Sequence, residues 1–162
     1  LVFLDIPTPN AVAVPGGVVG VTRGLLNLVK SDEGLAMVLG HELGHHQSRH
    51  VLKSLGRSLL WISAISIFME GYAVDSAQYL VQMFSASHSR EQEYEADRIG
   101  FKLAKKQLGT ADSYLEFFEK VHANYEEGES QWGDLFRSHP YTLDRIRRLK
   151  SMMKDVSSED IR

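Results

Sequence analysis

The sequence predicts an α+β domain that is mainly helical, with a small antiparallel sheet near its N-terminus and one helix that carries a His-Glu-x-x-His motif. Short β-branched apolar runs, separated by glycine and proline, occupy the chain up to Thr22. Beyond Ser31, apolar residues recur at every third or fourth position, which is the period of an amphipathic helix. The length of 162 residues suits a single domain, residues 1–162, and the absence of an initiator methionine indicates a piece of a longer protein.

Three strands are expected, at Leu1–Ile6, Ala11–Val14 and Val18–Thr22. The last two are joined by Pro-Gly-Gly at positions 15–17, which favours a tight turn. This pair should therefore form a hairpin within the sheet.

The first long helix is expected from Asp32 to about Ser54, because Ser31 can cap its N-terminus and acidic residues follow in the first turn. Gly40 and Gly44 weaken this helix by about 2 kcal/mol relative to alanine. We expect these glycines to let another backbone or a ligand approach closely.

An apolar run, Leu59–Met69, contains eleven residues without a charge, whereas a membrane span needs about 20. A buried helix is the expected role; a lid over the cleft, a partner surface and a membrane-interface patch are the alternatives. Later helices are expected around Tyr79–Phe84, from Ser89 (with Gln92 in a capping box) to Gly109, from Thr110 to Tyr125, and from Leu143 to Met153.

Composition excludes several classes of protein and of site. The 18 Lys and Arg residues against 21 Asp and Glu leave a formal charge of −3 without a basic block, which argues against a nucleic-acid partner. The chain has no cysteine, so disulfides and thiolate metal sites are excluded and a transition metal would need His, Asp or Glu ligands.

The strongest chemical signal is His41-Glu42-Leu43-Gly44-His45 in the first long helix. Residues four apart lie on one helical face, so the imidazoles of His41 and His45 can share one zinc ion. Glu42 projects about 100° away, where its carboxylate can act as the general base on the water that the metal activates.

A third ligand is expected from Glu93-Tyr94-Glu95-Ala96-Asp97. Glu93 and Asp97 are also four residues apart, so one can bind the metal while the other holds a ligand imidazole. Without the His-Glu-x-x-His helix, this acidic stretch would be interpreted as a solvated helix face.

Other histidines carry weaker signals. His46 and His50 form a competing pair, but Gln47 cannot serve as the base, so His46 is expected to face solvent and His50 to form a structural hydrogen bond near the site. His88 and His122 have no motif around them. His139 precedes Pro140 in a loop from which an imidazole can point into a cleft.

Four ordered groups of residues resemble one known family: Pro9–Gly17 with Val21–Leu26, His41–His45 with Arg49 and His50, Ser89–Asp97, and Ser138–Pro140 with Asp144–Ile146. The family is the gluzincin metallopeptidases that include the heat-shock protease HtpX and the CAAX prenyl endopeptidase. The resemblance covers most of the chain.

This resemblance implies one zinc ion per chain, held by three ligands: His41, His45 and Glu93. It also implies that Glu42 is the catalytic base, that Asp97 orients His41, and that His139 is catalytic because it stabilises the tetrahedral intermediate. The expected reaction is hydrolysis of peptide bonds by a zinc metalloendopeptidase.

The implied substrate is a peptide or unfolded protein that docks as an added strand beside the glycine-rich hairpin. The resemblance also implies a role in protein quality control of the cell envelope, in the periplasm or at a membrane. Membrane members of the family have several spanning helices, so any membrane association here would come through flanking segments or Leu59–Met69. The rival hypothesis is a zinc-stabilised scaffold or chaperone-like module, but such a module has no use for the non-ligating Glu42.

Overall fold

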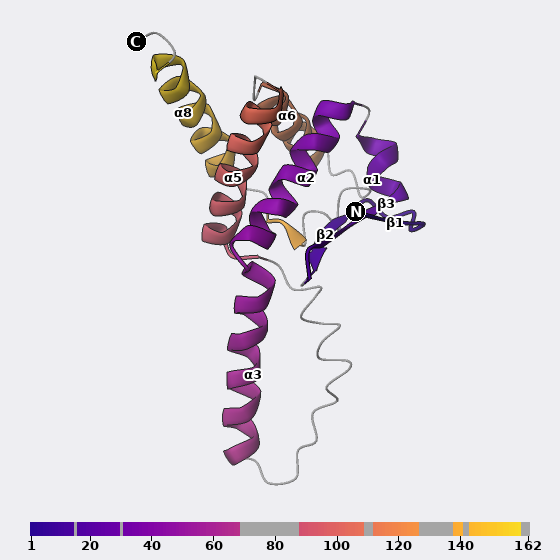
Figure 1. The fold of residues 1–162 in the computed structure, drawn as a ribbon, viewed down its shortest axis with the longest axis vertical. Coiled ribbons are helices and arrows are strands. Elements are labelled where there is room, and N and C mark those ends of the chain that lie inside the picture. Colours follow the sequence, from indigo (N-terminus) through magenta and orange to yellow (C-terminus); the bar gives the residue numbers. More distant parts are fainter. Residues whose placement is uncertain are drawn as a thin grey trace.

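The computed structural model describes residues 1–14, 16–29, 31–68, 88–108, 112–126, 138–140 and 143–159. Helices predominate, as expected, and a small sheet lies near the N-terminus (Figure 1). In chain order the elements are β1 Val2–Leu4, β2 Ala11–Val14, β3 Val18–Thr22, α1 Arg23–Leu28, α2 Asp32–Gln47, α3 His50–Phe68, α5 Arg90–Leu108, α6 Asp112–Glu126 and α8 Leu143–Glu159.

The sheet has the strand order β1-β3-β2 and is mixed. The hairpin of β2 and β3 is antiparallel, as expected, but β1 pairs with β3 in parallel, so the prediction of a purely antiparallel sheet is wrong. Residues 5–10 cross the end of β3 before β2 begins, and this crossing places β1 and β2 on opposite sides of β3. Gly24 permits the crossing: its amide donates to the carbonyl of Ile6 (3.0 Å), and a Cβ at this position would collide with the backbone of Pro7 and Pro9.

The predicted helix Asp32–Ser54 is in fact two helices, α2 and α3. α2 is capped by Ser31, whose hydroxyl accepts from the amide of Gly34 (3.0 Å), and it ends at Gln47. Arg49 then adopts a left-handed conformation, with φ of 55°, which a continuous helix does not allow. The chain turns there, and α3 projects away from the rest of the protein (Figure 1).

The apolar run that begins at Leu59 starts on this projecting helix. Leu59 is 50% exposed and Leu60 is 72% exposed, so burial, the expected role of the run, does not hold for these first two residues. The side chains from 61 to 69 lie outside the described residues. Among the helices that the structure describes, none combines the length and apolarity needed to cross a membrane.

The remaining predictions of helices are confirmed where the structure describes them. Ser89 and Gln92 form the expected capping box of α5: the Ser89 amide donates to Gln92 Oε1 (2.9 Å) and the Gln92 amide to Ser89 Oγ (3.3 Å). Helix α1 was not expected; its cap is Thr22, whose Oγ1 accepts from the amide of Leu25 (3.2 Å). The segment around Tyr79–Phe84 and the positions Gly109 and Thr110 lie outside the described residues.

Helix α2 lies between the sheet on one side and helices α5 and α6 on the other (Figure 1). The core formed around it joins the sheet to α5, α6 and α8, and includes Ala13, Val21, Leu25, Val38, Phe101, Phe118, Ile146 and Leu149. Helix α2 therefore contacts both the sheet and the helices α5 and α6, and joins the two sides of the core.

The two glycines of α2 permit a very close contact with α5, as the sequence predicts. A Cβ on Gly44 would lie 2.7 Å from the carbonyl oxygen of Ala96, and a Cβ on Gly40 would lie 3.3 Å from the Cα of Gly100. The two backbones therefore touch where a side chain would hold them apart. This contact sets the separation of the segments that carry His41, His45 and Glu93.

We expect Gly44→Ala to lower the free energy of unfolding by about 1–3 kcal/mol, because the added methyl group meets backbone atoms that cannot move without separating the helices. The matched control is Gly56→Ala on α3, where a Cβ has nothing within 4 Å. There, the higher helix propensity of alanine should stabilise the protein by up to about 1 kcal/mol. Urea unfolding followed by circular dichroism measures both changes, and equal stability of the two variants would contradict the close contact.

Candidate metal centre

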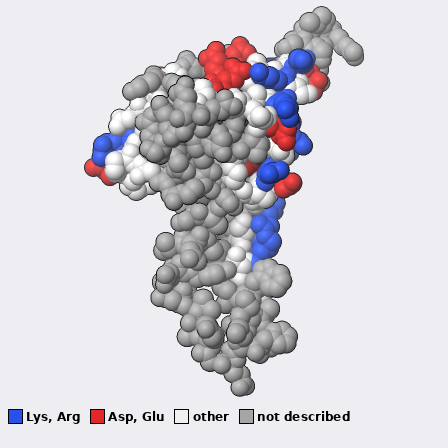
Figure 2. Space-filling view, turned by 180° about the vertical axis from the view of Figure 1, so that it is seen from behind, with Lys and Arg blue, Asp and Glu red and all other residues white. Residues whose placement is uncertain are grey.

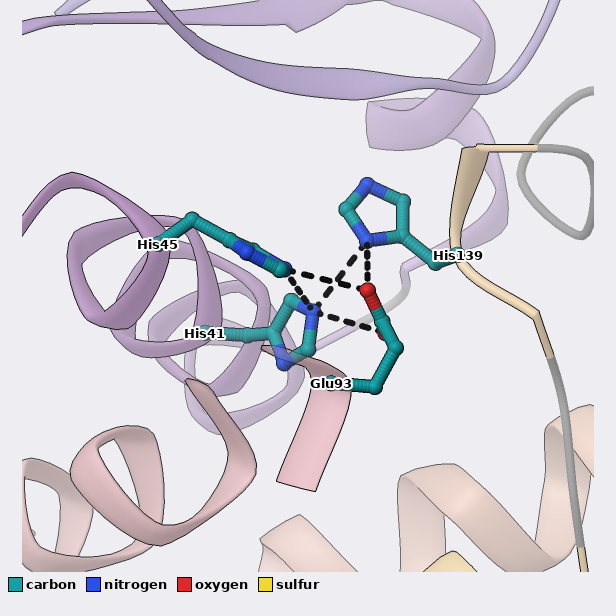
Figure 3. Close-up of side chains that lie close together, drawn as sticks. All are labelled: His41, His45, Glu93 and His139. Atoms are coloured by element: carbon teal, nitrogen blue, oxygen red, sulfur yellow. Dashed lines mark hydrogen bonds and ion pairs between the residues drawn. The ribbon is translucent and has the colours of Figure 1, made fainter. Parts of the chain in front are cut away.

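Four buried side chains converge on one point from three parts of the chain (Figure 3). His41 and His45 come from α2, Glu93 from α5, and His139 from residues 138–140. The Nε2 atoms of His41 and His45 are 3.0 Å apart, and Glu93 oxygens lie 3.3 Å from the former and 3.2 Å from the latter. His139 Nδ1 lies 3.2 Å from His41 Nε2 and 3.4 Å from Glu93 Oε1.

These separations fit a tetrahedral metal ion. Ligand atoms at a typical zinc distance of 2.0–2.1 Å from a common ion are about 3.4 Å from one another. The oxygens of Glu93 supply a second indication: both are buried, and among the described residues their neighbours are Arg145 Nη1, 2.7 Å from Oε2, and imidazole nitrogens at 3.2–3.4 Å. A carboxylate in this condition is suited to binding a cation.

Glu42 lies beside this cluster, and its side chain is buried. Its Oε1 is 3.3 Å from Nε2 of His139, whose other ring nitrogen faces His41 and Glu93. The two residues that the sequence predicts to be catalytic therefore contact each other next to the candidate ligands.

Asp97 and Arg145 support the cluster from one side. Asp97 Oδ1 is 2.9 Å from Nδ1 of His41, the arrangement expected of a carboxylate that orients a ligand imidazole. The guanidinium of Arg145 donates two hydrogen bonds of 2.7 Å to Asp97, one hydrogen bond of 3.2 Å to the carbonyl of Pro140, and lies against Glu93. One buried arginine thus joins both carboxylates to the segment that carries His139.

A second set of residues supports His45. Its Nδ1 is 2.8 Å from Nδ1 of His50, and Nε2 of His50 is 3.3 Å from Glu95 Oε2. Ser48 donates to the other oxygen of Glu95 (2.7 Å). His50 therefore forms a hydrogen bond near the site, as the sequence predicts. His88 stacks on the His45 ring at 3.9 Å between centroids.

The electrostatics of the two α2 imidazoles differ. Burial opposes protonation of His41, but the carboxylates of Glu93 and Asp97 outweigh it and raise the pKa of His41 to about 9. Burial lowers the pKa of His45 to about 2. Burial would raise the pKa of Glu93 and of Asp97, yet the Arg145 charge holds the Asp97 pKa below its usual range, and Arg145 and His41 hold the Glu93 pKa well below its usual range.

Arg145 and His88 are parts of the site that could not be identified from the sequence. Arg145 appears there only as part of a motif, because an arginine in a helix that also contains Arg147, Arg148 and Lys150 looks like any exposed cation. His88 has no spacing that relates it to His45; its position one residue before the Ser89 cap is the only local signal. His46 is exposed, as expected, and does not join the cluster.

Comparisons with known proteins agree on one family. The model described as "Peptidase family M48" matches residues 1–153. The chain is 30% identical over 157 residues to "Mitochondrial metalloendopeptidase OMA1" of Schizosaccharomyces pombe, which covers 93% of this chain and 45% of that protein. It is also 30% identical to "Protease HtpX homolog" of Salinibacter ruber, in a match that covers 91% of this chain and 69% of that protein. It is 30% identical as well to "Metalloprotease YcaL" of Escherichia coli, in a match that covers 87% of this chain and 57% of that protein.

We expect a divalent metal to release about one proton when it binds at pH 7, because the pKa of about 9 leaves His41 protonated, whereas the pKa of about 2 leaves His45 neutral. A ligand imidazole must be neutral, so apparent metal affinity should rise by up to about tenfold per pH unit and level off above the pKa of His41. Calorimetric titration with Zn²⁺ in buffers of different ionisation enthalpy counts the protons. The control, His46→Gln, should release as many as the unaltered protein, and zinc binding without proton release would contradict the expectation.

Proposed function

Because the chain belongs to peptidase family M48, we propose that it forms the catalytic part of a zinc-dependent metalloendopeptidase. The observation that carries this proposal is the convergence of His41, His45 and Glu93 on one point, with the buried carboxylate of Glu42 beside them. We propose residues 1–162 as one catalytic domain. The chain spans less than half the length of the yeast OMA1 relatives, so the activity of the whole protein is part of this proposal.

Zinc is the proposed metal, because imidazole and carboxylate ligands in a chain without cysteine suit it. His41, His45 and Glu93 would hold the ion and leave a fourth position for water and substrate. When bound, zinc would polarise the scissile carbonyl and acidify the attacking water. Asp97, held by Arg145, would keep the imidazole of His41 in the orientation that binding needs.

Glu42 is the proposed general base. It follows His41 in α2, so it projects about 100° away from that imidazole and reaches the reacting water from the side. Glu42 would accept a proton from the water and deliver it to the leaving amine. Its buried position, with Oε1 3.3 Å from Nε2 of His139, supports this role.

His139 is proposed to donate a hydrogen bond to the oxyanion that forms as the carbonyl is attacked. Its contact with Glu42 supports a position at the reacting atoms. The closeness of its Nδ1 to His41 and Glu93 also suits a fourth metal ligand, and this alternative has a different experimental signature.

The proposed substrate is an extended segment of peptide or unfolded protein that adds to β2. This strand lies at an edge of the sheet, so one row of its backbone groups is free to pair with another strand. A hollow of about 390 Å³ runs from Ala13 and Val14 of β2 to His45. A strand added at this edge would therefore pass the metal ligands.

We further propose a periplasmic or membrane-associated location and a role in protein quality control of the cell envelope. This part of the proposal rests on the resemblance to HtpX-like proteins, and the match to the HtpX homolog supports it. Association with a membrane would come through segments beyond residues 1–162 or through the apolar end of α3.

We expect zinc-loaded Glu42→Gln to keep its metal and its fold while hydrolysis of unfolded casein falls by at least about 10²- to 10⁴-fold, because glutamine cannot accept a proton. Zinc content, circular dichroism and casein cleavage test this directly. Glu91→Gln makes the same chemical change at an exposed position and should be fully active. Cleavage by Glu42→Gln at the unaltered rate would favour the rival scaffold hypothesis or another base.

We expect His139→Ala to lower kcat by about 10²- to 10³-fold with unchanged zinc affinity, because one donor to the oxyanion is lost while the three ligands remain. Glu91→Ala, at an exposed position of α5, serves as the control. Zinc affinity comes from competition with a chelator, and kcat from a fluorogenic peptide. A loss of zinc affinity in His139→Ala would instead identify this residue as a ligand.

A further inference from the structure

A second hollow, of about 590 Å³, lies behind the metal centre, between the α2–α3 corner and α5. We call it the basic groove. Its lining contains five cations, Arg49, Lys53, Arg98, Lys102 and Lys106. All five are exposed, and within the part of the chain that the structure describes none of their side chains forms an ion pair. From behind, Lys and Arg side chains gather along the side of the protein where α5 and α3 lie (Figure 2).

The one carboxylate in the basic groove does not neutralise these cations fully. Glu95 is already engaged by Ser48 (2.7 Å) and His50 (3.3 Å). The cations come from two elements that face the same hollow, so their mutual repulsion is relieved when an anion binds between them. The protein carries a net charge of −3, so this concentration of positive charge is local.

The shape and floor of the basic groove favour a polypeptide. Arg98, Lys102 and Lys106 recur along one face of α5 over about 12 Å, which matches about four residues of extended chain. Half-buried Ile99 and Leu103 lie between these cations and form an apolar floor. Because side chains alternate along an extended segment, such a segment can place acidic side chains against the cations and apolar side chains against Ile99 and Leu103. The flat surface of a bilayer would contact only the exposed edges of the groove.

The basic groove adjoins the proposed substrate path at Arg49. Arg49 lines both this groove and the hollow between β2 and His45. A chain that adds to β2 and passes His45 can therefore continue over Arg49 into the basic groove. We propose that the basic groove binds an acidic segment of the polypeptide substrate at a distance from the bond that is cleaved, an inference that rests on the proposed function.

The test uses two fluorogenic peptides that share one cleavable sequence taken from digested casein. One ends in an acidic segment of about four Glu residues and the other in the same number of Gln, each joined through glycine-serine spacers of several lengths. For the unaltered protein we expect the acidic segment to lower KM by about fivefold, with kcat unchanged, since the contact is the same before and during reaction. The difference should shrink as salt is added.

Lys53→Gln/Lys102→Gln removes one cation from each wall and should abolish the preference for the acidic peptide. Arg147→Gln/Lys154→Gln removes the same charge from exposed positions of α8 and should keep it. A preference that survives in the groove variant, or an unaltered protein that cleaves both peptides without preference, overturns the proposal.

Fluorescence anisotropy with zinc-loaded Glu42→Gln measures binding of the same peptides without cleavage. If this binding of the acidic peptide depends on Lys53 and Lys102 while the unaltered, zinc-loaded protein cleaves neither peptide, the groove is supported and the proposed hydrolysis fails. Equal binding of both peptides, with groove-dependent binding to vesicles that contain phosphatidylglycerol, would assign the groove to a lipid surface and overturn the proposal.

Discussion

The whole site depends on how closely α2 approaches α5. Gly44 of α2 lies against Ala96 of α5, and Gly40 lies against Gly100, so the two backbones meet without intervening side chains. The polar side chains begin directly beside these contacts: His41 follows Gly40 and His45 follows Gly44 on α2, and on α5 Asp97 follows Ala96 while Glu93 lies about one turn before it. This close approach brings the Glu93 oxygens to 3.3 Å from Nε2 of His41 and to 3.2 Å from Nε2 of His45.

The close contact buries several carboxylates together, and Arg145 supplies the positive charge that stabilises two of them. The three carboxylates of Glu42, Glu93 and Asp97 lie together with four imidazole rings and have little access to solvent, and an isolated buried carboxylate is strongly unfavourable. Arg145 forms a bidentate pair with Asp97 and also lies against Glu93, so its single charge is shared between them. The same guanidinium also donates a hydrogen bond to the carbonyl of Pro140, the residue after His139. The position of His139 therefore depends on the cation that balances the charges of Asp97 and Glu93.

The sequence predicts the parts of the site that follow from local spacing. Residues four apart on a helix must share a face, which is why His41 with His45 and Glu93 with Asp97 could be placed before any tertiary contact was known. Residues brought in by tertiary packing leave no such pattern. Arg145 and His88 approach the site from α8 and from the residue before the α5 cap, and nothing in their local sequence separates them from exposed residues.

The same limit applies to the fold: hairpin β2–β3 follows from its turn, whereas the parallel pairing of β1 depends on a crossing that only Gly24 permits. The break at Arg49 was missed because residues 45–50 contain neither glycine nor proline, so nothing in this polar stretch marks the end of α2.

The left-handed turn at Arg49 separates the geometry of the site from that of the segment that follows. Helix α2 has already placed its ligands before the chain turns, and α5 is held by its own cap and by the glycine contact. The close approach of α2 and α5 is therefore set by their own contact and not by the connection between α3 and α5. The entropic cost of closing a longer connection grows slowly, by about 0.6 kcal/mol for each doubling of its length. A sequence of this kind can gain or lose residues in that connection over evolutionary time, and so acquire new attachments, while the arrangement of ligands stays the same.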